Sequence, residues 1–298
     1  MDAVSPLRTE LIVGVTSHRD LDPASVPMLR AQVREALAML RERYPDLALV
    51  VVSALAEGGD RLVAETALDA GARLVVPLPL PVSLYRRDFA TAESQHAFTR
   101  LLEGAEIVQL SLAESNLDVL ASPGPARDRQ YLHAGLFVAN HCHVLFALWD
   151  GRDESGTGGT AQIVRYYLGG PVPGARRATD NLRQMLAGDD DSLVLHIHAR
   201  RAGEPATPDD ARPPTWCTTG GVRPFAAGPP PEYDRIFRRM QAFEFDRRTL
   251  DPHHLPAASA SASRQVRSAG SSLAAGRTTS SRARRSRSKA CMRRKMRS

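Results

Sequence analysis

Short apolar runs that alternate with amphipathic stretches constrain the fold of this chain more than any other feature. Runs of this kind suit strands that are buried on both faces of a parallel sheet. The strands predicted in this way cover residues 11–15, 47–55, 73–81, 106–112, 142–149 and 192–200. The alternation predicts an α/β fold, namely a Rossmann-like open, mostly parallel sheet with helices on both faces.

Helical spacing of apolar residues marks the segments between these strands. The predicted helices cover residues 23–44, 61–70, 90–103, 127–140 and 159–168. Residues 202–231 are rich in turn formers, and a short helix over 233–248 is expected to dock back on the body. We therefore predict three parts: a nucleotide-binding domain (1–200), an irregular extension with a docking helix (201–250) and a disordered basic tail (251–298).

The tail carries the basic charge of the chain. Of 39 Lys and Arg residues, 12 lie in 252–298, which has no Asp or Glu, so residues 1–251 have a formal net charge of −6. A basic arm of this kind would bind nucleic acid or anionic lipid through phosphate contacts. Alternatively, the Arg- and Ser-rich tail is the product of a shifted reading frame in a GC-rich gene, which we favour.

The chain has the features expected of a cytoplasmic protein. No apolar run reaches the length of a membrane span, and the first residues, MDAVSPLRTE, lack the apolar core of a signal peptide. The three cysteines, Cys142, Cys217 and Cys291, form no disulfide framework. Their number and spacing favour a reducing compartment.

The first candidate binding loop, GVTSHRD (14–20), follows the first strand. In an open parallel sheet, ligands bind beyond the carboxyl ends of the strands. This loop offers close backbone approach, two hydroxyls and two basic side chains, from Gly14, Thr16, Ser17, His18 and Arg19. The same residues also suit a helix entry in which Asp22 caps a helix that starts at Pro23.

The second candidate loop lies in SALAEGGDRLVAE (53–65). Ser53 ends a strand, and Gly58, Gly59 and Asp60 open the next helix. Free N–H groups at a helix N-terminus suit an anion. Asp60 could equally be an ordinary N-cap.

The third candidate loop is DGRDESGTGGTAQIVR (150–165), again between a strand and a helix. It lacks the lysine of a P-loop, so it is either a flexible connection or a different anion-binding turn. Asp150 could accept a hydrogen bond from a sugar hydroxyl or simply form a turn after a core Trp149. The candidate ligand contacts in this loop are Asp150, Gly156, Gly158, Gly159 and Thr160.

In their order and spacing, the three motifs resemble the SLOG superfamily, a Rossmann-like group that includes LOG phosphoribohydrolases, the DNA-processing protein A family and YpsA-like proteins. The resemblance covers about residues 9–200. It implies a nucleotide or nucleotide derivative as ligand, sensed on behalf of an effector protein. By position, it assigns ligand contacts to Gly14, Ser53, Gly58, Gly59, Gly156, Gly159 and Thr160.

One departure from the family pattern bears on catalysis. LOG hydrolases carry PGGxGTxxE, and Ile163 stands where this glutamate would be. Cleavage of a glycosidic bond needs a carboxylate, for which Glu57 and Asp60 are the candidates. We therefore expect binding or sensing of a nucleotide, without a cofactor. An N-glycosidase acting on a nucleoside monophosphate is the alternative, and nucleic-acid binding through the tail is a second one.

Two further expectations concern metals and assembly. His141, Cys142 and His143 lie close together, and His196 and His198 alternate on another strand, but the spacings of zinc sites are absent. We expect these residues to be structural and the protein to hold no metal. Assembly of the chain into a homo-oligomer is left open by the sequence.

Overall fold

The computed structural model describes residues 9–112, 117–152, 157–173 and 192–250. Their centre is one eight-stranded sheet with the order β4-β3-β2-β1-β5-β6-β7-β8. Its strands are β1 (Glu10–Ser17), β2 (Ala48–Val52), β3 (Arg73–Leu78), β4 (Glu106–Gln109), β5 (Val144–Trp149), β6 (Val194–His198), β7 (Thr215–Thr218) and β8 (Gly221–Pro224). β1 to β6 pair in parallel, and β7 and β8 add an antiparallel edge. The predicted α/β class and its mostly parallel sheet are confirmed.

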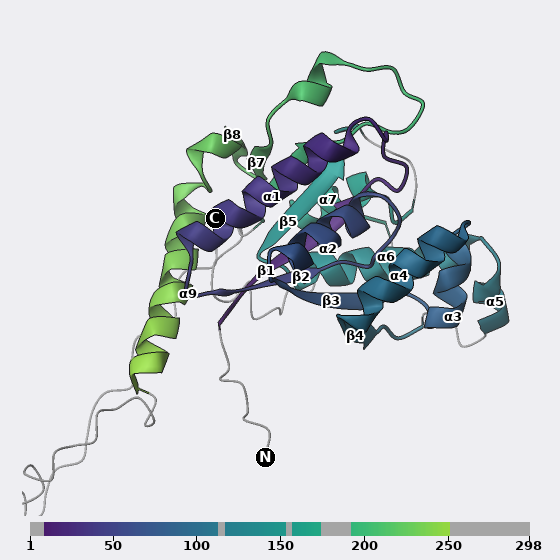
Figure 1. The fold of residues 1–298 in the computed structure, drawn as a ribbon, viewed down its shortest axis with the longest axis horizontal. Coiled ribbons are helices and arrows are strands. Elements are labelled where there is room, and N and C mark those ends of the chain that lie inside the picture. The colour runs from purple at the N-terminus through teal and green to yellow at the C-terminus, as the bar shows by residue number, and fades with distance from the viewer. Residues whose placement is uncertain (1–8, 113–116, 153–156, 174–191, 251–298) are drawn as a thin grey trace, which may run out of the picture. The chain divides into compact units, whose positions relative to one another are not determined.

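Helices cover the sheet on two sides (Figure 1). The helices are α1 (Val26–Arg43), α2 (Gly59–Asp69), α3 (Val82–Tyr85), α4 (Ala92–Glu103), α5 (Leu117–Ala121), α6 (Pro125–Asn140), α7 (Thr160–Tyr167) and α9 (Pro231–Leu250), with 3₁₀ turns η1 (Arg86–Asp88), η2 (Pro208–Ala211) and η3 (Phe225–Ala227). None of the described helices is long and apolar enough to cross a membrane.

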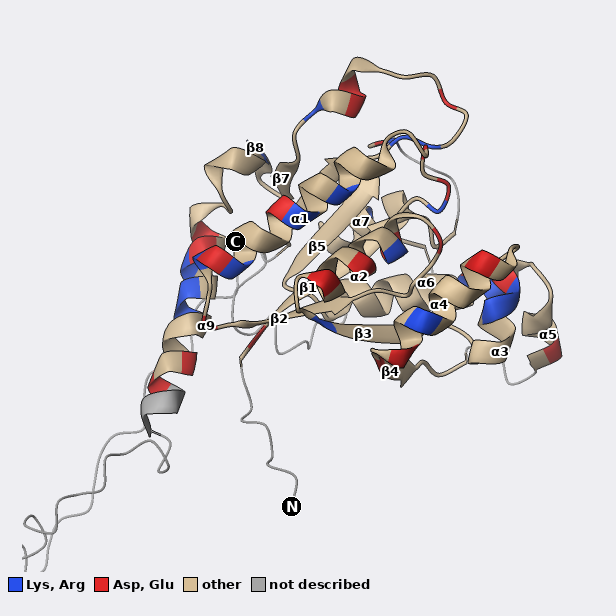
Figure 2. Ribbon diagram, in the orientation of Figure 1, with Lys and Arg blue, Asp and Glu red and all other residues tan. Residues whose placement is uncertain are grey.

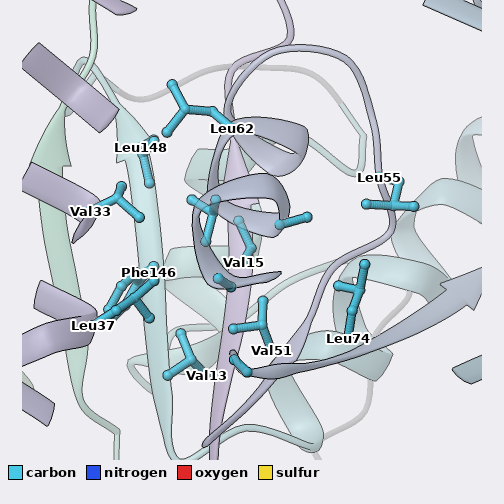
Figure 3. Packing of buried hydrophobic residues seen from close by; sticks show 14 of the residues in the cluster. Val13, Val15, Val33, Leu37, Val51, Leu55, Leu62, Leu74, Phe146 and Leu148 are labelled. Atoms are coloured by element: carbon cyan, nitrogen blue, oxygen red, sulfur yellow. The ribbon is translucent and has the colours of Figure 1, made fainter. Parts of the chain in front are cut away.

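The two faces of the sheet build two apolar clusters. Successive side chains of a strand point to opposite faces of the sheet, so each strand contributes to both clusters. In β1, the buried Leu11, Val13 and Val15 point to one face, while Ile12 packs on the other. The first cluster packs the sheet against α1, α2, α4 and α9. Figure 3 shows Val33 and Leu37 of α1 against strand residues of this cluster. The second cluster packs the opposite face against α6 and α7.

Charged side chains lie mainly on helices and loops and are scarce on the central strands (Figure 2). On β1, β3 and β4 the charged side chains form ion pairs at the strand starts: Arg73 of β3 contacts Glu10 of β1 and, at 3.0 Å, Glu106 of β4. These pairs are half exposed, so each contributes little to stability. The pattern agrees with strands that are buried on both faces.

Two local expectations were wrong. The first helix begins at Val26 after Ser25, and Asp22 does not cap it; instead the Asp22 carboxylate pairs with Arg200. The last strand is not the segment 192–200, since β7 and β8 follow within the stretch that looked turn-rich. The predicted tail, 251–298, lies outside the described residues.

Candidate functional site

The strand order changes direction at β1. From β1 the chain builds β2, β3 and β4 on one side and β5 to β8 on the other. Such a switch point leaves a crevice beyond the carboxyl ends of the strands. The described residues enclose a pocket of about 370 Å³ there, lined by the ends of β1 to β3, by α2, α3, α6 and the start of α7, and by Arg201.

At one wall of the pocket, β1 is joined to α2 by a buried polar pair. The Ser17 hydroxyl donates a hydrogen bond to Asp60 Oδ1 at 2.7 Å. Asp60 lies in the first turn of α2 and is 6% exposed. Burial raises the pKa of Asp60 to about 6, although Ser17 and the charge of Arg19 oppose the shift. The pocket therefore contains a carboxyl group that titrates just below neutral pH.

Beside this pair, His18 connects β1 to the end of β5. The backbone N–H of Asp150 donates to His18 Nε2 at 3.2 Å, and the Asp150 carboxylate lies 3.4 Å from the same nitrogen. Burial and the charge of Arg201 lower the pKa of His18. The backbone N–H of Arg152 lowers the pKa of Asp150 against the opposing effect of burial. We therefore expect His18 to be neutral and Asp150 to be ionised near pH 7.

The start of α7 forms another wall. Gly158 has a φ of +80°, and a Cβ there would lie 3.0 Å from the backbone nitrogen of Leu132 in α6. Gly159 precedes the helix and has no side chain to cap its first turn, while the Gln162 side chain accepts from the Gly158 N–H at 2.5 Å. The first N–H groups of a helix have no intrahelical partner. This wall consequently offers backbone donors rather than a side-chain charge.

Tyrosines of α3 and α6 close the third wall. Tyr85 is buried, and Tyr131 lies under the Arg19 guanidinium, 5.2 Å from it. The Tyr131 hydroxyl donates to Asp88 and accepts from Arg127 Nε at 2.6 Å. Arg127 also pairs with Asp88. This network fixes Tyr131 as a rigid wall.

Seven of the predicted contacts line this pocket: Thr16, Ser17, Arg19, Asp60, Gly158, Gly159 and Thr160. Gly156 lies outside the described residues. The structure thus brings parts of all three sequence motifs to one place. Their shared position follows from the parallel strands, whose carboxyl ends lie on the same side of the sheet.

Three predicted glycines lie off the pocket and serve close packing. A Cβ on Gly14 would lie 2.7 Å from Cys142 Sγ beneath α6. Gly58, with a φ of +80°, faces the carbonyl oxygens of His18 and Arg19, and Gly59 N donates to the His18 carbonyl at 3.1 Å. These glycines let α6 and α2 approach β1, which shapes the pocket indirectly.

The remaining predicted residues also lie off the pocket. The Ser53 hydroxyl donates to the carbonyl of Asp60 at 3.2 Å. Asp150 supports His18 rather than reaching the pocket. Glu57 accepts a hydrogen bond from Ser94 of α4. Of the two carboxylates considered for catalysis, only Asp60 faces the pocket.

Tyr85, Tyr131 and Arg201 line the pocket but are not among the residues predicted from the sequence. Tyr85 and Tyr131 come from helices with no motif, so nothing local marks them. Arg201 follows β6 and pairs with Asp20 at 2.8 Å. Its position after a strand is the signal that could have placed it at the site.

The cysteine and histidines near β5 make hydrogen bonds and packing contacts within the fold. His143 Nδ1 accepts a hydrogen bond from the backbone N–H of Ile12 at 3.0 Å. Cys142 is buried against Gly14. His196 contacts the Trp149 carbonyl at 3.1 Å, and His198 lies 3.3 Å from Asp210. Within the described ranges, no group of three potential ligands could hold a metal ion.

The raised pKa of Asp60 gives a testable dependence of stability on pH. The folded protein holds the Asp60 proton more tightly than the unfolded chain, where the pKa is 3.8. This stabilisation is present below about pH 4 and is lost as the pH rises through 6, a loss of roughly 3 kcal/mol. We expect Asp60→Asn to lack that loss, because Asn can still accept from Ser17.

The measurement is urea unfolding from pH 4 to 7.5. The free energy of unfolding of Asp60→Asn relative to wild type should rise across this range. Asp69→Asn on the exposed side of α2 is the control and should follow wild type. Parallel curves for Asp60→Asn and wild type would show that Asp60 titrates normally.

Comparisons with known proteins find similarity of fold only. No protein-family model matches the chain, and no curated protein does. One solved structure with a similar fold is DNA processing protein A from Streptococcus pneumoniae, with 14% identity and a TM-score of 0.35 over 59% of this chain and 56% of that one. The Helicobacter pylori protein, described for its single-stranded DNA binding mode, shows 18% identity and a TM-score of 0.35 over 53% and 62%. This chain therefore has a distant likeness in fold to DNA processing protein A, and its matched part spans less than two thirds of those chains.

Proposed function

We propose that this protein binds a nucleotide or nucleotide derivative in the switch-point pocket. The observation that carries the proposal is the convergence of three loops there: the end of β1, the start of α2 and the uncapped start of α7. Backbone N–H groups at the start of α7 suit a phosphate. Arg19 and Arg201 add positive charge at the same pocket.

The pocket's size and walls favour a mononucleotide. A volume of about 370 Å³ is at the lower end of small-molecule sites. The half-buried Tyr131, together with the Arg19 guanidinium over its ring, provides flat surface of the kind on which a base can stack. We assign this function to residues 1–200 with Arg201, in a cytoplasmic protein that signals ligand binding to an effector.

Binding without turnover is the form we favour. Ile163, at the position of the family's glutamate, is 1% exposed and packs against Gly135 of α6. It fills this part of the pocket with apolar surface. The second candidate, an N-glycosidase, is favoured by one observation: buried Asp60 in the pocket, with a pKa of about 6, suits a general acid.

A thermal-shift panel of mono-, di- and cyclic nucleotides tests the proposal, with each mixture assayed for released base. A ligand at 100 times its dissociation constant stabilises the fold by roughly 2.7 kcal/mol. Stabilisation with intact ligand would support binding, and released base would support the glycosidase. No shift with any nucleotide would contradict both.

Gly159→Val is the site variant. Its φ of −71° tolerates a side chain, so we expect the fold to persist while the added methyl groups occupy the start of α7. Affinity for a nucleotide found in the panel should fall by at least about tenfold, measured by calorimetry. Gly104→Val is the control, since a Cβ there meets nothing within 4 Å, and Gly104 does not line the pocket. Equal affinity of both variants would remove the α7 start from the site.

A further inference from the structure

We infer that His18 is a ligand-recognition residue: its Nδ1–H donates a hydrogen bond to an oxygen or ring-nitrogen acceptor of the bound ligand, and the backbone of Asp150 holds the ring in that tautomer. The inference rests on the proposed function and adds to it a residue that selects the ligand. It also assigns Asp150 a positioning role instead of the ligand contact expected from the sequence.

The first step concerns the ring nitrogen that faces β5. The Asp150 backbone N–H can only donate, so His18 Nε2 at 3.2 Å has to accept. A proton on Nε2 would point at this N–H. The Asp150 carboxylate at 3.4 Å is the more distant partner, and Oδ1 already accepts the Arg152 N–H at 3.0 Å. Neutral His18 therefore carries its proton on Nδ1.

The second step concerns the charge of the ring. His18 is 2% exposed, and a buried imidazolium is costly. The charged groups that act on it are Arg201, Asp150 and Asp20, and burial together with Arg201 outweighs the two carboxylates to lower the pKa. The ring is therefore neutral near pH 7, with one donor and one acceptor.

The third step concerns where the donor acts. His18 lines the pocket, and no described residue accepts a hydrogen bond from Nδ1. Nor is Nδ1 among the buried side-chain atoms that are sealed away without a partner. Next to it, Ser17 already gives its proton to Asp60. His18 Nδ1 thus offers the pocket a neutral donor, in addition to the Arg19 guanidinium and the backbone donors of α7.

Two substitutions separate the two ring nitrogens. His18→Asn places an amide N–H near the Nδ1 position and removes the acceptor for Asp150. His18→Gln places an amide oxygen near the Nε2 position and removes the pocket donor. If the inference holds, His18→Gln keeps the stability of wild type but loses roughly tenfold in affinity for AMP, the loss of one hydrogen bond. His18→Asn should be less stable yet bind AMP within about threefold of wild type.

The tautomer is measured directly by ¹⁵N NMR of histidine-labelled full-length protein at pH 7.5, with and without AMP. We expect the His18 Nδ1 to carry the proton, and its signal to shift with AMP. A proton on Nε2, or a charged ring, would overturn the inference whether or not AMP binds. Wild-type affinity in His18→Gln would overturn it and leave the proposed function standing. Failure of wild type to bind any nucleotide would contradict the proposed function, and the tautomer would still show whether His18 presents a donor.

Discussion

Replacing Gly58 by alanine should destabilise the protein by roughly 3 to 5 kcal/mol. Gly58 has a φ of +80°, which strains any other residue by about 1 to 3 kcal/mol. Its Cβ would also press against the carbonyl oxygens of His18 and Arg19, closer than nonbonded atoms approach. Since these are backbone atoms, α2 has to move away from β1, and the Ser17–Asp60 hydrogen bond is lost with it.

Gly71→Ala is the matched control for this variant. Gly71 follows α2 with a φ of +74°, but its Cβ would meet only the Arg41 side chain, at 3.8 Å. Gly71→Ala therefore shows the backbone strain alone, about 1 to 3 kcal/mol. Urea unfolding of both variants measures the difference. Equal losses would mean that close approach of α2 to β1 does not matter for stability.

Truncation of Trp216 in β7 should cost about 3 to 5 kcal/mol. Trp216 is fully buried in the larger apolar cluster, its Nε1 donates to the Phe225 carbonyl at 3.4 Å, and its ring lies 5.8 Å from that of Phe225. Trp216→Ala leaves a large cavity between the antiparallel edge of the sheet and its helices. Chemical unfolding followed by far-UV circular dichroism measures the loss.

Val222→Ala in the neighbouring β8 serves as its control. Val222 is 71% exposed, so its truncation should change the free energy of unfolding by less than about 0.5 kcal/mol. A small effect of Trp216→Ala, similar to that of Val222→Ala, would show that β7 and β8 are only loosely attached to the sheet. The predicted large effect makes this edge part of the cooperative fold.

The central strands could be predicted from the sequence, whereas the edge strands β7 and β8 could not. β1, β2 and β5 are continuous apolar runs, because parallel strands are covered on both faces. β7 (TWCT) and β8 (GVRP) have four residues each, with Gly, Pro and Thr among them. Segments of this length are too short to show an alternation, and pairing, of β7 with β6 and of β8 with β7, decides their conformation.

Part of the candidate site could likewise be predicted from the sequence, and part could not. The sequence by itself determined which strand ends carry glycines, hydroxyls and Asp60, because the hydrophobic pattern sets the strands and so the positions of the loops after them. Only the tertiary structure decided what each residue does there. Gly14 and Gly58 turned out to allow close packing, since a Cβ clash depends on the side chains of Cys142 and Val138 or on the carbonyls of His18 and Arg19. Tyr131 and Arg201 reached the pocket from distant segments, and contacts between distant segments are set by packing, which leaves no local pattern in the chain.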